Sequence, residues 1–143
     1  MKRGICVVVI SLGLLVVGLS AFGQSLPIRA NIPFPFIVAD RELAAGEYTA
    51  RMVNNGAVLE IQSTDGRYST FMIAKPVSAK TTAAHQNQFV FNRYGEDYFL
   101  SKVWWADYGL GSELDKSSRE IGLAKLATGK TVNIATSNNQ KLK

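Results

Sequence analysis

Short apolar runs, separated by Gly, Asn and Asp, occupy the chain between residues 28 and 105. They are rich in Val, Ile, Phe, Tyr and Thr, a pattern typical of an antiparallel sheet protein. In the segment IPFPF at 32–36, Pro33 and Pro35 lack backbone donors. We therefore expect this segment to lie at a sheet edge or to cross between sheets.

The clearest hairpin is predicted for 47–63. A two-residue type I′ turn at Asn55-Gly56 pairs Val53 with Val58 and Met52 with Leu59. A one-residue slip would turn the apolar face outward, so pattern and turn predict the same register. That register places Tyr48, Ala50, Met52, Leu59 and Ile61 on one face and Arg51 opposite Glu60 on the other.

The next loop is predicted to contain three residues, 64–66, with Gly66 in the left-handed region. This length places Phe71 opposite Leu59, on the core face. A second hairpin, 89–94 and 98–105, turns at Gly95, Glu96 and Asp97. Its aromatic residues occupy both odd and even positions, which point to opposite faces of a strand. We therefore expect a central ribbon covered on both sides.

After residue 105 the pattern changes. Ser117 is suited to cap a short helix near 117–127, and 131–136 is compatible with one more strand. The polar segment 137–143 is expected to be a disordered tail. The fold class predicted is all-β, an antiparallel β-sandwich or small barrel with a short C-terminal helix.

The N-terminus has the pattern of a secretory signal peptide over 1–23. Lys2 and Arg3 precede an apolar run at 5–19, and small residues stand at Ala21 and Gly23. The run is shorter than the roughly 20 residues of a membrane-spanning helix. We expect cleavage after Gly23, a single β domain at 24–136 with no transmembrane segment, and a periplasmic or extracellular location. The alternative is a retained N-terminal anchor.

Removal of the signal peptide changes composition in two ways. The formal charge falls from +5 to +3, because Lys2 and Arg3 are lost. This mild charge is compatible with a solvated surface or with anionic envelope polymers, and we expect no nucleic-acid partner. The only cysteine, Cys6, is lost as well, so the mature chain has no disulfide or thiolate site.

Few residues in the mature chain are suited to catalysis. His85 is the single histidine, and a zinc site or a serine hydrolase needs more partners than the sequence offers. We therefore expect no metal, no cofactor and no catalytic residue. Carboxylates suited to glycoside hydrolysis remain an alternative: Glu96, Asp97, Asp107, Glu113 and Asp115.

The most suggestive surface candidate combines aromatic and acidic residues suited to stacking on a sugar ring. Its members are Trp104, Trp105, Asp107 and Tyr108. On a strand the two tryptophans point to opposite faces, so one of them is expected in the core. The alternative is that both pack in the core.

The hexapeptide LAAGEY at 43–48 has the form of a tyrosine corner, with Leu43, Gly46 and Tyr48 as its structural residues. Gly56, Gly66 and Gly95 are predicted structural residues of the turns. Together with IPFPF at 32–36, FNRYGEDYFLSKVW at 91–104 and ELDKSSRE at 113–120, the chain resembles a group of small exported bacterial proteins of unknown function. The resemblance implies a shared architecture and an envelope location, but no activity.

These observations predict a non-enzymatic binding or structural module of the cell envelope, whose partner is an envelope polysaccharide or an envelope protein. Two alternatives stay open. One is a glycan-acting enzyme that uses surface carboxylates, and the other is an accessory subunit that binds a partner by β-strand addition.

Overall fold

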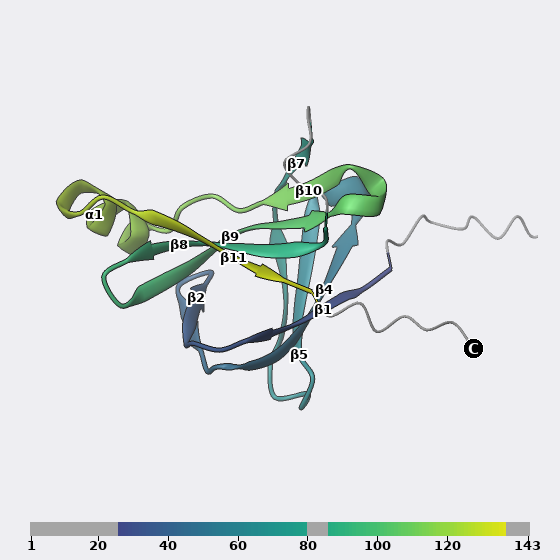
Figure 1. The fold of residues 1–143 in the computed structure, drawn as a ribbon, viewed down its shortest axis with the longest axis horizontal. Helices are drawn as coiled ribbons and strands as arrows, with labels where there is room; N and C mark the ends of the chain where they lie inside the picture. Colours follow the sequence, from purple (N-terminus) through teal and green to yellow (C-terminus); the bar gives the residue numbers. More distant parts are fainter. Residues whose placement is uncertain (1–25, 80–85, 137–143) are drawn as a thin grey trace, which may run out of the picture.

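A computed structural model describes residues 26–79 and 86–136. These residues form eleven strands, two short 3-10 turns and one α-helix, and the strands belong to two sheets (Figure 1). The predicted all-β sandwich with a C-terminal helix is confirmed. The predicted signal peptide, His85 and the predicted tail at 137–143 lie outside the described residues.

The first sheet is antiparallel, in the order β1 (Ile28–Ile32), β4 (Gly46–Val53), β5 (Val58–Ser63) and β6 (Ser69–Ile73). The predicted register of β4 and β5 is confirmed, with Val53 opposite Val58 and Met52 opposite Leu59. The turn between them, η1 (Asn54–Gly56), has positive φ at Asn55 (52°) and Gly56 (94°), as a type I′ turn requires.

The predicted position of Phe71 is wrong. Phe71 pairs with Glu60 and lies on the outer face, while Met72 pairs with Leu59 and is buried. The loop after β5 contains four residues instead of three, because Ser63 and Tyr68 already form the first backbone hydrogen bond. Asp65 accepts from the Arg67 amide at 3.0 Å, which lowers the pKa of this carboxyl. One extra loop residue shifts the register by one position and reverses the faces of β6.

The second sheet has the order β11 (Lys130–Ala135), β8 (Gln88–Tyr94), β9 (Asp97–Trp105), β10 (Leu110–Glu113) and β7 (Lys75–Ser78). The turn η2 (Ala106–Tyr108) joins β9 to β10. The short strand β2 (Phe36–Val38) pairs with β3 (Arg41–Leu43) and, in parallel, with β9. The segment with the two prolines crosses from the first sheet to the second, as predicted.

The main core lies between the two sheets. The first sheet contributes mainly Ile32, Ala50, Leu59 and Ile61, and the second contributes Phe36, Phe89, Phe91, Val103 and Trp105. Between Val90 and Phe91 the ladder of β8 and β9 shifts register, so a second cluster of Ile37, Tyr94 and Phe99 forms beyond this bulge. The predicted two-sided coverage of the ribbon is thereby explained.

The helix α1 (Ser118–Leu126) covers this second cluster with Leu123. Ser117 is its N-cap, as predicted, and its side chain accepts from the Glu120 amide at 3.2 Å. The helix lies at one end of the molecule, at the left of Figure 1. Within the described residues no helix has the length and apolar character needed to cross a bilayer.

Candidate functional site

Trp105, one of the four predicted surface residues, belongs to the core. Its side chain is 1% exposed, and its indole N–H donates to the Leu26 carbonyl at 3.2 Å. The prediction of Trp105 as a sugar-binding residue is therefore wrong. The strand alternation of β9 directs Val103 and Trp105 inward, so that Trp104 lies on the opposite face.

The other three predicted residues remain at the surface. Trp104 is half-buried, and the Lys102 ammonium lies 5.3 Å from the centre of its ring. The ring lies close to Gly111, where a Cβ atom would stand 2.8 Å from it. Asp107 and Tyr108 are exposed in η2. In the parts of the chain that the structure describes, no hydrogen bond or ring contact joins Trp104 to Tyr108.

The tyrosine corner has the hydrogen bond that its motif predicts. The Tyr48 hydroxyl donates to the Ala44 carbonyl at 2.8 Å, and Leu43 is buried at the end of β3. Burial raises the pKa of Tyr48, and the nearby Asp65 carboxyl and Tyr68 raise it further. Gly66 and Gly95 have positive φ values, 74° and 61°, as residues of turns.

The carboxylates of the alternative, a glycan-acting enzyme, are mostly engaged in ion pairs. Arg93 contacts Glu96 at 3.3 Å, Arg119 contacts Asp97 at 3.0 Å, Lys102 contacts Glu113 at 3.0 Å, and Lys75 contacts Asp115. Asp107 is exposed. No three His, Cys, Asp or Glu side chains among residues 26–79 and 86–136 lie close enough together to hold a metal ion.

The open edge of β6 is a feature that the sequence did not reveal. β6 ends the order of the first sheet, and no described strand pairs with its outer side. Tyr68 and Ala74 make backbone bonds to the β5 side, so Thr70 and Met72 face β5 as well. By the alternation of an antiparallel ladder, Ser69, Phe71 and Ile73 direct their N–H and C=O groups toward the open side.

Two large apolar side chains stand on this edge. Phe71 is 64% exposed and Ile73 is 90% exposed. Ile73 continues a row across the outer face of the sheet, opposite half-buried Val58, which in turn lies opposite Val53. We call the outward backbone groups of Ser69, Phe71 and Ile73, with the side chains of Phe71 and Ile73, the β6 edge.

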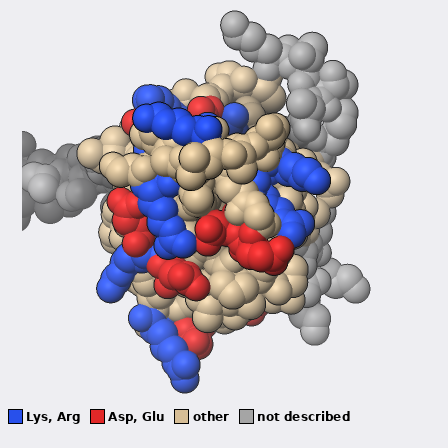
Figure 2. Space-filling model, turned by 90° about the vertical axis from the view of Figure 1, so that its left-hand side faces the viewer, with Lys and Arg blue, Asp and Glu red and all other residues tan. Residues whose placement is uncertain are grey.

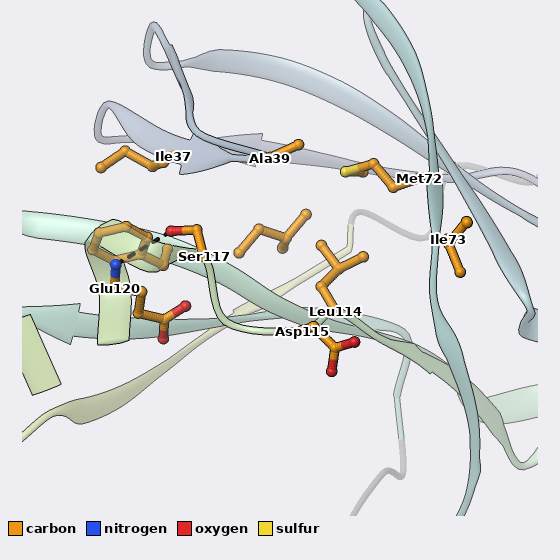
Figure 3. Close-up of a pocket in the computed structure, with 10 residues that line it drawn as sticks. Ile37, Ala39, Met72, Ile73, Leu114, Asp115, Ser117 and Glu120 are labelled. Atoms are coloured by element: carbon orange, nitrogen blue, oxygen red, sulfur yellow. Dashed lines mark hydrogen bonds between the residues drawn. The ribbon is translucent and has the colours of Figure 1, made fainter. Parts of the chain in front are cut away.

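A small pocket lies beside the β6 edge (Figure 3). Its volume is about 110 Å³, several times the roughly 30 Å³ of one liquid water molecule. Met72 and Ile73 form one wall, Ile37 and Ala39 from the β2–β3 hairpin form another, and Leu114 lies opposite. Phe99 and Leu100 of β9 and Glu120 of α1 complete the lining, so the pocket is bounded by several separate elements. Its size is suited to a single aliphatic side chain.

Two carboxylates stand at the polar end of this pocket, and both already have partners. Asp115 accepts from Lys75, which raises the pKa of that lysine. Glu120 is 3% exposed and accepts from the Asn92 amide at 2.7 Å and from the Tyr94 hydroxyl at 3.4 Å. Ser117 adds one hydroxyl to the lining, and the other lining residues are apolar, so the pocket favours an apolar side chain.

Comparisons of the chain with protein-family models, with curated proteins and with solved structures found no match. Only the geometry of the structure therefore supports the β6 edge and its pocket as a candidate site. The sequence carried one signal for the edge. Phe71, Met72 and Ile73 are consecutive apolar residues, so one short strand has apolar side chains on both of its faces. Which parity faces solvent depends on a single loop residue.

Proposed function

We propose that the protein is a non-enzymatic binding module of the cell envelope, which takes an extended apolar segment of a partner polypeptide along the β6 edge. The observation that supports this most directly is an open strand edge that carries Phe71 and Ile73 in exposed positions. The envelope location follows from the predicted signal peptide at 1–23.

The composition of β6 favours strand addition. Soluble proteins usually block a free edge with proline, with lysine or with a covering loop, because an open edge pairs readily with other chains. Residues 69–73 are Ser, Thr, Phe, Met and Ile, with no proline or charge among them. An added strand would bond to the outward backbone groups, and one inward side chain would enter the pocket beside Met72.

The charges at the two ends of β6 indicate what kind of segment fits. Arg67 precedes the strand and Lys75 follows it. If two copies paired antiparallel about Phe71, Arg67 of each copy would lie opposite Lys75 of the other, and like charges in that position are destabilising. The exposed contacts of Arg67 with Asp65 and of Lys75 with Asp115 reduce this repulsion but do not remove it. A partner segment with an uncharged centre and acidic ends avoids this repulsion, so we favour a partner over a second copy.

The test uses a synthetic peptide in which valine and threonine alternate between terminal glutamates. We expect addition of the peptide to shift and protect the backbone amides of Ser69, Phe71 and Ile73 in NMR spectra. By the alternation of the β5–β6 ladder, the amides of Thr70 and Met72 face β5 and should change less. A peptide N-methylated at every residue should not bind, because it lacks the backbone donors of a strand on both of its edges.

Matched variants separate the edge from general apolar exposure. Ile73→Lys should weaken binding of the peptide by about tenfold, the usual effect of losing one well-placed contact. Ile121→Lys on α1, where Ile121 is 45% exposed, should leave binding unchanged. Equal loss in both variants, or no protection of β6 amides, would contradict the proposal. A dimer in sedimentation that Ile73→Lys dissociates would assign the edge to a second copy instead.

A further inference from the structure

A groove separate from the β6 edge lies between α1 and the neighbouring strands β8 and β11. Its volume is about 550 Å³, within the range of sites that hold small ligands. Asn92 and Tyr94 come from β8, Thr131 comes from β11, and Lys116 and Lys125 stand before and within α1. We call this the lysine groove.

The charges around the groove differ from those elsewhere on the protein. In the described ranges, seven cationic side chains form ion pairs with acids, and Arg41 lies over the ring of Tyr68. The cations left without such a contact in these ranges are Lys116, Lys125 and Lys130. Two of them line the groove, and Lys130 stands between the lining residues Gly129 and Thr131.

Figure 2 views the molecule from the side on which α1 lies, where acidic side chains gather toward the centre and Lys and Arg side chains surround them. Asp97 and Glu96 carry negative charge in this region, but Arg119 and Arg93 neutralise them. Glu120 is an acid beside the groove with no cationic partner among the described residues, and Lys116 and Lys125 outnumber it. The groove therefore keeps a net positive charge, which attracts an anion.

The floor of the groove supplies fixed polar groups. Asn92 and Tyr94 both donate to the buried carboxylate of Glu120, at 2.7 Å and 3.4 Å. These bonds orient both side chains and leave the amide oxygen of Asn92 as an acceptor. Thr128 and Thr131 add hydroxyl groups on the same lining. Such groups match the hydroxyls of a sugar, while the lysines match its acidic substituents.

We infer that the lysine groove binds an acidic saccharide, a sugar that carries carboxylate or phosphate groups. The chemistry follows from the combination of unpaired lysines with hydroxyl and amide groups in one concave site. Lysine binds either anion as a point charge, so the shared chemistry is that of an anionic sugar. This site is independent of the β6 edge and does not rest on strand addition.

The test measures binding of defined probes by calorimetry and NMR at low salt. Digalacturonate supplies carboxylates, glucose 6-phosphate supplies a phosphate, and maltotriose is the neutral control. We expect at least one acidic sugar to bind, to shift the amides of Lys125 and Thr131, and to lose affinity as salt rises. We expect maltotriose to bind much more weakly than either acidic sugar.

Variants identify the residues that act. Lys116→Gln and Lys125→Gln should each lower the affinity for the acidic sugar by roughly two- to fivefold. This is the range that exposed ion pairs usually contribute. Lys75→Gln, which removes a lysine at the other site, should have no effect. Ile73→Lys should also bind the sugar normally, which distinguishes failure of this site from failure of the β6 edge.

Four outcomes would overturn the inference. One is the absence of binding by both acidic sugars, and another is equal binding of maltotriose. Binding of inorganic phosphate as tight as that of glucose 6-phosphate would show that the site selects anions without reading the sugar. Retention only on anionic phosphatidylglycerol vesicles, through the exposed Leu126 beside Lys125, would assign the surface to a membrane.

Discussion

At the scale of single residues, Tyr48 ties the entrance of β4 to the preceding turn. Its hydroxyl bonds to Ala44 at 2.8 Å, while its ring packs edge-on against Phe36 at 4.9 Å in the main core. The same side chain therefore joins a local turn to the contact between the two sheets. Removing only the hydroxyl separates these two contributions.

Tyr48→Phe should lower the free energy of unfolding by about 1 kcal/mol, since the Ala44 carbonyl loses its donor. Chemical denaturation at neutral pH measures this change. Tyr108→Phe is the matched control, because Tyr108 is 48% exposed in η2. Equal losses in the two variants would show that the corner bond contributes nothing of its own.

The pH dependence of the same residue has a defined sign. Burial raises the pKa of Tyr48 above its usual 10.0, so the folded state holds the phenolic proton more tightly than the unfolded state does. The resulting stability is full below pH 10 and is lost as the pH rises through the raised pKa. Denaturation curves measured from pH 8 to 11 should show that the free energy of unfolding falls less with rising pH in Tyr48→Phe than in the unaltered protein.

Gly56 occupies the most demanding backbone position of the turns. Its φ is 94°, and a Cβ atom there would stand 3.1 Å from the Gly111 carbonyl and 3.3 Å from the Met52 sulfur. Gly56→Ala should therefore cost roughly 2 to 4 kcal/mol, from the left-handed conformation and from overpacking. Gly66→Ala has a similar φ of 74° but open space, and should cost only roughly 1 to 2 kcal/mol. Thermal unfolding of both variants tests the difference.

At the scale of elements, β6 shows how one loop residue decides which side chains are buried. Met72 faces the core because the loop after Ser63 has four residues, and the same length exposes Phe71 and Ile73. The strand sequence itself is compatible with both arrangements. The register can be tested through the stability of point variants.

Met72→Ala should lower the free energy of unfolding by about 2 to 4 kcal/mol, the usual effect of truncating a buried methionine. Phe71→Ala should change it by less than about 0.5 kcal/mol, since its side chain is mostly in solvent. Urea denaturation of the two variants measures both values. A larger loss for Phe71→Ala would mean that the three-residue loop is the correct one.

The two tryptophans of β9 differ in environment, although they are neighbours in the chain. Acrylamide should quench the fluorescence of Trp104 and leave that of Trp105 nearly unaffected, because Trp105 is 1% exposed. In Trp104→Phe the remaining emission should be blue-shifted and protected, and in Trp105→Phe it should be accessible. The reverse result would show that Trp104 is buried and Trp105 is exposed, which contradicts the assignment of the two faces of β9.

At the scale of the whole molecule, the two sheets and α1 divide the surface into separate regions. The β6 edge belongs to the first sheet, and the lysine groove lies against the second sheet. The buried Glu120 stands between them, since it lines the small pocket and also holds Asn92 and Tyr94 of the groove. The two proposed binding surfaces therefore lie on different parts of one domain.

The N-terminal part of the described chain is tied to the core at Leu26, whose carbonyl accepts from Trp105. The predicted cleavage after Gly23 leaves this contact intact. We expect the mature protein to begin at Gln24 and to appear in the periplasmic or culture fraction. Mass spectrometry of that fraction tests this prediction, and a full-length chain retained in the inner membrane would contradict it.

Much of the first sheet could be predicted from local features. The turn at Asn55-Gly56, the alternation on β4 and β5, and the cap at Ser117 each depend on a few neighbouring residues. Local conformational preferences and face alternation act over such distances, so the sequence alone was sufficient for those elements. The candidate site could not be found in this way, because its parts come from distant segments.

The sequence by itself determined the all-β class, the hairpin register and the position of the terminal helix, because periodicity and turn chemistry are properties of short segments. The tertiary structure decided which tryptophan is buried, which face of β6 meets solvent, and which lysines lack an acidic partner. These three outcomes depend on how distant strands pair and on which side chains they bring together. A one-residue difference in a loop reverses a face, and charge compensation depends on neighbours as far apart as Lys75 and Asp115.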